Sequence, residues 1–292
     1  MTPTTLMIAA SMAGYLAGSI PFGLLLLVGI GSFALSIRRR SLGDVVAVMG
    51  LIYMSLDANR HGPLLAIVGA PIFAEHLAFV KSITTRTPKM TVPSPIVLHF
   101  MGGSDAILRE AYTSLDTFWS DVIEVYRQEF AALYNAGCRY LQVDETSLVK
   151  FGDPDIRSII ERRGDDWRKL VETYVDVINA VLSSAPSGMP VGIHVCRGNR
   201  KGFWQADAGY EFMADQLFRR LKAQFYFLEF DSPRAGPLEA LKLMPDDKTV
   251  VLGLITTKSP ELEEKEALKK RIREASAYVG MDRLCLSPQC GF

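Results

Sequence analysis

Residues 166–195, DWRKLVETYVDVINAVLSSAPSGMPVGIHV, carry the pattern that decides the fold of this chain. An amphipathic stretch predicts a helix over Asp166–Leu182, and the apolar run after it predicts a strand over Val191–Val195. The same alternation extends to both sides. Further strands are predicted at Leu64–Val68, Thr91–Leu98, Tyr140–Val143, Phe225–Phe230, Thr249–Ile255 and Arg283–Ser287, and further helices at Thr117–Ala136, Tyr210–Ala223 and Pro260–Tyr278.

This strand–helix alternation predicts an α/β fold with parallel strands joined by right-handed crossovers. Such a sheet is either open and doubly wound or closed into a (β/α)8 TIM-type barrel. No G-x-G-x-x-G follows a predicted strand, which weakens the dinucleotide-binding option. The polar residues of interest follow the C-terminal ends of strands, where barrel active sites are built. We therefore predict the barrel, with Ser259 as N-cap and Pro260 as first residue of its last helix.

The composition excludes one class of partner. The 292 residues hold 32 Lys and Arg against 32 Asp and Glu, and this zero net charge argues against nucleic-acid binding. Four cysteines are too few for a disulfide framework and suggest a reducing compartment or a metal. Two of them, Cys138 and Cys285, are predicted to be buried and to pack as small apolar side chains.

The N-terminal segment 1–37 has no charged side chain, and Arg38–Arg40 follow it directly. Its apolar part, residues 6–35, exceeds the roughly 20 residues of a membrane-spanning helix. The basic cluster after the span predicts a cytoplasmic catalytic domain that the segment anchors to the membrane. Two alternatives stay open. A cleaved signal peptide would carry its basic residues before the apolar run, and the segment could also be foreign to the domain behind it.

The second alternative, a segment foreign to the domain, has a basis in the residues Gly14–Leu26, GYLAGSIPFGLLL. They resemble the first membrane helix of the bacterial glycerol-3-phosphate acyltransferase family. The resemblance covers these 13 residues alone, so it indicates a fused or mis-joined reading frame and no acyltransferase activity. The expected organisation is a hydrophobic segment over 1–37, a basic turn and linker over 38–63, and a catalytic barrel over 64–292.

The residues with the clearest chemistry begin in the strand Val191–Val195. His194 and Cys196 are two residues apart and point to the same face of that strand. Imidazole with thiolate is a ligand pair typical of zinc. Glu229 ends the next strand and Cys290 follows the last, so the four could form a zinc site that binds a substrate thiol. Taken singly, each is more typical of core packing or of a paired carboxylate.

Six motifs stand in order along the chain: Thr91–Pro95, Gly137–Glu145, His194–Asn199, Leu228–Asp231, Leu252–Leu254 and Ser287–Gly291. Together they resemble a known family, the C-terminal catalytic barrel of cobalamin-independent methionine synthase and its stand-alone relatives. The resemblance runs from about Leu64 to Phe292. The resemblance implies that His194, Cys196, Glu229 and Cys290 bind Zn²⁺.

The implied activity is zinc-dependent transfer of a methyl group, from a donor such as a methylated folate, to a thiol such as homocysteine. By resemblance Asp144 binds the amino group of the amino-acid substrate, and Glu145 follows it; a strand-end carboxylate that caps a loop is the alternative for Asp144. Arg197 and Asn199 are predicted to contact donor or acceptor, or else to form an ordinary loop turn.

The chain departs from the family at three places. Lys258 stands where the folate-dependent enzymes carry a histidine that assists proton transfer, so Lys258 is the predicted catalytic residue. Because an ammonium group does not replace imidazole, the methyl donor could differ from the methylated folate of those enzymes. The Gly-Ser and Gly-Glu motifs of the first two barrel strands are not found, and the chain stops at Phe292. We therefore expect an incomplete barrel of reduced stability. The alternatives are another zinc-thiolate alkyl transfer or C–S bond reaction, and an inactive truncated or fused product.

Overall fold

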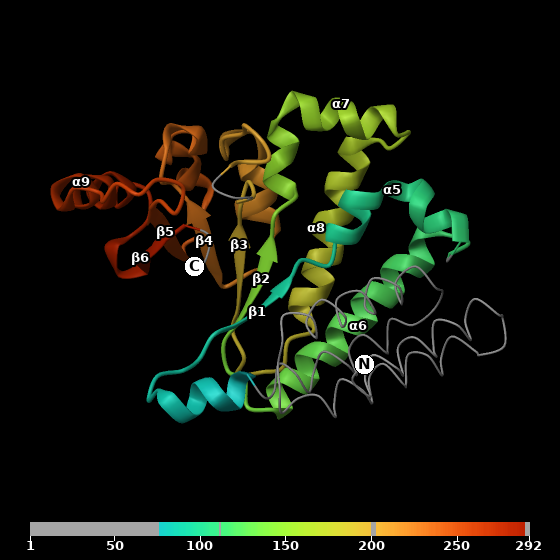
Figure 1. Cartoon of the computed structure of the whole chain (residues 1–292), viewed down its shortest axis with the longest axis horizontal. Helices are drawn as coiled ribbons and strands as arrows, with labels where there is room; N and C mark the ends of the chain where they lie inside the picture. Colours follow the sequence, from blue (N-terminus) through green and yellow to red (C-terminus); the bar gives the residue numbers. More distant parts are fainter. Residues whose placement is uncertain (1–75, 111, 200–202, 290–292) are drawn as a thin grey trace, which may run out of the picture.

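The computed structural model describes residues 76–110, 112–199 and 203–289. Their centre is one parallel sheet of six strands in the order β1-β2-β3-β4-β5-β6 (Figure 1). The strands are β1 (Met90–Pro93), β2 (Leu141–Glu145), β3 (Val191–Val195), β4 (Phe225–Glu229), β5 (Thr249–Ile255) and β6 (Leu284–Pro288).

The order of the strands distinguishes between the two expected architectures. In a doubly wound sheet the order reverses near its middle, whereas here every strand pairs with its neighbours in sequence. Sequential parallel pairing is what a TIM-type barrel repeats around its axis. The α/β class and the parallel sheet are therefore confirmed, and among the described residues the six strands form an open sheet.

Three of the helices that connect the strands begin at a residue whose side chain caps the first turn. Residues 76–83 are helical, and the longer helices are α5 (Val97–Glu110), α6 (Leu115–Asn135), α7 (Pro154–Arg162), α8 (Trp167–Ser183) and α9 (Lys265–Ala275). The side chain of Asp153 caps α7, and that of Asp166 caps α8 by accepting from backbone N–H groups of the first turn. Helices α5, α6 and α8 lie together beside β1–β3, and α9 lies beside β5 (Figure 1).

The core lies between the sheet and these helices. On β3, Val191, Ile193 and Val195 are at most 5% exposed and belong to the same hydrophobic core as Tyr174 and Ile178 on the buried face of α8. The other face carries Gln142 and Asp144 on β2, His194 on β3 and Glu229 on β4, because side chains alternate along a strand. Packing on one face thus determines which residues of the sheet remain available for chemistry on the other.

The strand predicted at Thr91–Leu98 is wrong in its second half. Strand β1 ends at Pro93, and α5 begins at Val97. The backbone N–H of Ser94 still donates to the carbonyl of Asp144 at 3.0 Å, but Pro95 has no N–H to continue the ladder. The chain turns there, and the apolar residues after it belong to a helix.

Two predicted helices are also corrected. The last one starts at Lys265 instead of Pro260, because the Glu263 carboxylate accepts from the backbone N–H of Thr256 at 2.6 Å and holds residues 256–264 as a loop. Ser259 is therefore not its N-cap. The helix predicted over Tyr210–Ala223 is a 3-10 turn at Glu211–Met213 followed by a π-helix at Asp215–Arg220.

One cysteine prediction is confirmed and one is wrong: Cys138 is buried, whereas Cys285 on β6 is exposed. The predicted membrane segment, the linker and the strand Leu64–Val68 lie outside the described residues. Among the residues that the structure describes, none of the helices has the length and apolar character needed to cross a membrane.

Candidate metal centre

Three of the four predicted zinc ligands come together at the C-terminal edge of the sheet. His194 is the fourth residue of β3, Cys196 follows that strand directly, and Glu229 is the last residue of the neighbouring β4. One ligand atom of each lies within 4.8 Å of the others. Cys196 and Glu229 are buried, and His194 is half-buried. The fourth predicted ligand, Cys290, lies outside the described residues.

This donor set suits zinc. Imidazole nitrogen, thiolate sulfur and carboxylate oxygen are the groups that bind Zn²⁺ in proteins. The sulfur of Cys196 accepts a hydrogen bond from the backbone N–H of Gly198 at 3.0 Å, a contact that stabilises a thiolate. Gly198 has a φ of +88°, which glycine adopts without strain and which brings its N–H to the sulfur.

The charges of the cluster act on His194. Burial is the largest influence and lowers the pKa of His194, but the hydrogen bond and charge of Cys196 raise it, and so do the charges of Glu229 and Asp144. Together they hold the pKa of His194 above its usual value. An excess of negative charge around an imidazole is the environment into which a cation binds.

Tyr210 holds the two strand ends together behind the ligands. Its hydroxyl accepts from the backbone N–H of Glu229 at 2.7 Å and donates to the carbonyl of Val195 at 2.9 Å. The ring is fully buried. This residue therefore sets the distance between the end of β3, which carries Cys196, and the end of β4.

Arg197 lies on the same buried side. Its guanidinium is 4.5 Å from the Tyr210 ring centre, donates to the carbonyl of Glu229 at 3.4 Å and also donates to the carbonyl of Ala208. The side chain is 1% exposed and does not line the neighbouring cavity. The placement favours support of Glu229, and a contact of Arg197 with the substrate stays a prediction.

Lys258 reaches the candidate metal centre from the loop after β5. Its ammonium nitrogen is 4.0 Å from Oε1 of Glu229 and 5.4 Å from the ring centre of Trp204, and its side chain is 3% exposed. The amide of Gln289 lies beside Lys258, Asp231 and Glu229. A buried positive charge is thus held next to the carboxylate ligand.

Asn199 links two loops above the same edge. Its side-chain amide donates to the hydroxyl of Thr257 at 3.0 Å, so the loop after β3 is tied to the loop that carries Lys258. Asn199 itself is exposed. This position is compatible with the predicted contact to donor or acceptor.

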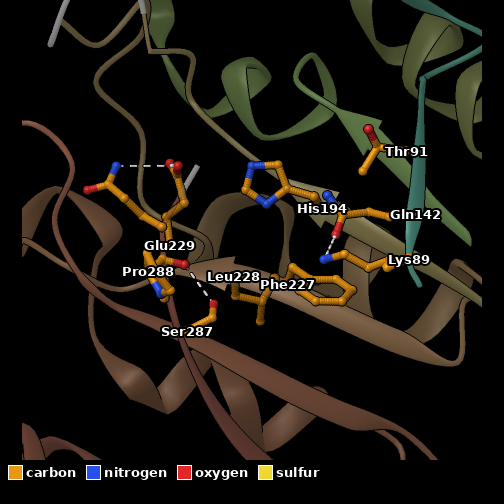
Figure 2. Close-up of a pocket in the computed structure, with 11 residues that line it drawn as sticks. Lys89, Thr91, Gln142, His194, Phe227, Leu228, Glu229, Ser287 and Pro288 are labelled. Carbon is orange, nitrogen blue, oxygen red and sulfur yellow. Dashed lines mark hydrogen bonds between the residues drawn. The ribbon is translucent and has the colours of Figure 1, made fainter. Parts of the chain in front are cut away.

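A cavity of about 290 Å³ opens next to the candidate ligands (Figure 2). It is lined by residues of all six strands, with His194 and Glu229 directed toward it from neighbouring strands. Below His194 the wall consists of Phe227, Gln142 and Lys89. A small molecule in this cavity would meet the candidate ligands His194 and Glu229 at one end and polar side chains at the other.

The two predicted acidic residues on β2 differ in their surroundings. Asp144 is half-buried, lies beside His194 in the sheet, and accepts from the Gln142 amide at 2.5 Å. Glu145 is fully buried, and its carboxylate accepts from the backbone N–H groups of Ser147 and Leu148. Burial raises the pKa of Glu145. Glu145 therefore caps the turn after β2, and its predicted contact with substrate is not favoured by this geometry.

Sequence reasoning did not identify Lys89, Gln142, the role of the Tyr210 hydroxyl, or Gln289. Gln142 had a usable signal, because it is two residues before Asp144 and so shares its face of the strand. Lys89 precedes β1 and carries no such signal.

Comparisons with known proteins agree with this geometry. The sequence profile of the family described as cobalamin-independent synthase, catalytic domain, matches residues 63–292. The uncharacterized protein YxjG of Bacillus subtilis is 40% identical over 220 residues, which are 75% of this chain and 58% of that protein. The methionine synthase of Pyrococcus horikoshii is 24% identical over 222 residues, which are 76% of this chain and 55% of that protein.

Among solved structures, a Listeria monocytogenes protein assigned as a vitamin-B12-independent methionine synthase is similar with a TM-score of 0.58 and 33% identity. The match covers 75% of this chain and 63% of the other. The chain thus spans a little over half the length of the curated relatives it matches. With a profile match over most of its length, the chain belongs to the family of cobalamin-independent synthase catalytic domains.

Proposed function

We propose that this chain is the catalytic part of a zinc-dependent methyltransferase that methylates the sulfur of a small thiol such as homocysteine. The observation that carries the proposal is the cluster of His194, Cys196 and Glu229, whose ligand atoms lie within 4.8 Å of one another beside a cavity. Membership of the family and the names of its relatives support the choice of reaction.

The ligands would be His194, Cys196 and Glu229, with Cys290 as the proposed fourth. Zn²⁺ bound there would favour the thiolate form of a substrate thiol at neutral pH, which supplies the nucleophile. The backbone N–H of Gly198 would hold the sulfur of Cys196, and Tyr210 would keep the two strand ends at the spacing that the ligands need.

The remaining residues would bind and orient the two substrates. The carboxylate of Asp144 would accept the ammonium group of an amino-acid thiol, because it lies beside His194 on the neighbouring strand. Lys258 would offset the negative charge of the ligand set through Glu229 and would provide the proton that the departing donor group takes up. Asn199 would contact the donor from the loop after β3.

A second candidate is another zinc-thiolate alkyl transfer or C–S bond reaction. It is favoured by Lys258, which stands where the resemblance to the folate-dependent enzymes calls for histidine. An ammonium group binds an anionic donor more readily than imidazole does near neutral pH.

We also infer that the six described strands correspond to part of a (β/α)8 barrel.

The test is methyl transfer by the purified full chain after zinc loading. Methylated folate, methylcobalamin and small alkyl donors are offered in turn with homocysteine. We expect zinc-dependent formation of methionine from one of them, with loss of at least 100-fold in Cys196→Ser. Cys285→Ser is the matched control, because this exposed cysteine is outside the cluster. Activity that persists in Cys196→Ser, or that does not depend on zinc, would contradict the proposal, and transfer of a different alkyl group would favour the second candidate.

A further inference from the structure

A chain of hydrogen bonds runs along the cavity wall from Lys89 to Asp144. The ammonium group of Lys89 donates to Oε1 of Gln142 at 2.6 Å (Figure 2). The Nε2 of the same amide donates to Oδ1 of Asp144 at 2.5 Å. Gln142 is only 8% exposed, so these two partners take the place of water for its amide.

Lys89 decides which way the Gln142 amide points. An amide can present either its oxygen or its nitrogen to a neighbour, and only the nitrogen can donate to a carboxylate. Because Lys89 is purely a donor, it binds the oxygen and leaves the nitrogen for Asp144. Without Lys89 the Gln142 amide could turn over, and its oxygen would then face the carboxylate oxygen of Asp144. The carboxylate of Asp144 would lose its fixed orientation.

The position of Lys89 is held by a second contact. Its ammonium nitrogen lies 4.1 Å from the centre of the Phe227 ring, on the strand next to His194. The charge is therefore fixed at the cavity wall although the residue is exposed.

We propose that Lys89 and Gln142 are positioning residues, which orient the carboxylate of Asp144 toward the ammonium group of an amino-acid thiol. The inference rests on the proposed function, since it takes the substrate to be an amino acid that carries a thiol. It predicts selection for the amino group itself, because the sulfur and the carboxylate of the substrate do not depend on this chain of contacts.

The test compares two ligands that differ by one group. Homocysteine and 4-mercaptobutanoate share the thiol and the carboxylate, and only homocysteine has the amino group. Calorimetry on the zinc-loaded full chain gives the dissociation constant of each for the natural protein, Lys89→Met, Lys89→Arg and Gln142→Glu. The control is Lys169→Met, the same substitution at an exposed site on α8.

We expect Lys89→Met to weaken homocysteine binding about three- to tenfold, because the substitution removes one partly exposed hydrogen bond from a charged group. The dissociation constant of 4-mercaptobutanoate should not change. Lys89→Arg keeps a donor and should retain most of the affinity. Gln142→Glu keeps a partner for Lys89 but sets a carboxylate against Asp144, so it should weaken homocysteine more strongly. Lys169→Met should bind both ligands as the natural protein does.

Equal weakening of both ligands in Lys89→Met and Gln142→Glu would show a merely structural role and would overturn the inference, as would unchanged homocysteine binding. In either case the proposed function would stand, provided that the natural protein binds homocysteine more tightly than 4-mercaptobutanoate. If the natural protein binds neither thiol, the proposed function fails first and this inference with it.

Discussion

The contact between Tyr210 and the ends of β3 and β4 leads to a specific prediction. Tyr210→Phe removes one hydroxyl and leaves the packing of a fully buried ring in place. The backbone N–H of Glu229 and the carbonyl of Val195 then lose their partner. Each buried polar group left without a hydrogen bond costs about 1–3 kcal/mol, so for these two groups the free energy of unfolding should fall by about 2–6 kcal/mol.

The same substitution should loosen the metal centre. Partners that hold metal ligands in place typically contribute about 10- to 100-fold to metal affinity. Tyr210→Phe should therefore weaken zinc binding by that factor, because Cys196 and Glu229 are no longer held at one spacing. Urea unfolding of the metal-free chain measures the first effect, and competition with a zinc chelator measures the second.

Tyr226→Phe is the matched control. Tyr226 is equally buried, and its hydroxyl donates to the carbonyl of Leu221 at 2.7 Å, before the start of β4 and away from the metal ligands. This variant should lose about 1–3 kcal/mol of stability and keep its zinc affinity. If the two variants lower zinc affinity equally, or if Tyr210→Phe leaves it unchanged, the reasoning about the strand ends is refuted.

Two further predictions concern buried titratable groups. Burial lowers the pKa of His99 to about 4, from 6.5 in the unfolded chain, so the unfolded state binds the proton first as pH falls. The free energy of unfolding should therefore decrease by about 3 kcal/mol as pH drops from 6.5 to 4. His99→Gln should flatten this part of a pH series of urea melts. Burial raises the pKa of Glu129 to about 7, and its carboxylate has no hydrogen-bond partner in the described part of the chain. The protein should therefore lose stability between pH 4.5 and 7, and Glu129→Gln should be about 2 kcal/mol more stable than the natural protein at pH 8; an equal or lower melting temperature there would contradict this.

Strands β3 and β5 show what the sequence could predict. VGIHV and TVVLGLI are short, rich in β-branched residues and bounded by turn-forming residues, and both have the predicted ends. The sequential order of strands then places the end of β3 beside the end of β4. For this reason His194, Cys196 and Glu229 could be expected at one edge before any coordinates were known.

The errors arose where tertiary contacts outweigh local signals. The sequence Ser259–Pro260–Glu261 has the features of a helix start, yet the bond from Glu263 to Thr256 keeps that segment in a loop. Lys89 could not be placed from the sequence, because its contact with Gln142 spans 53 residues and depends on how a whole crossover packs. Distant pairings of this kind are set by the fold and not by local spacing.

The most direct test of the central claim is X-ray absorption at the zinc edge of the loaded chain, measured with and without homocysteine. We predict one zinc per chain, bound by nitrogen, oxygen and sulfur, with one more sulfur neighbour when homocysteine is present. The Cys196→Ser variant should show one sulfur fewer in both states. A zinc site whose sulfur count is unaffected by homocysteine, or by the loss of Cys196, would contradict the account.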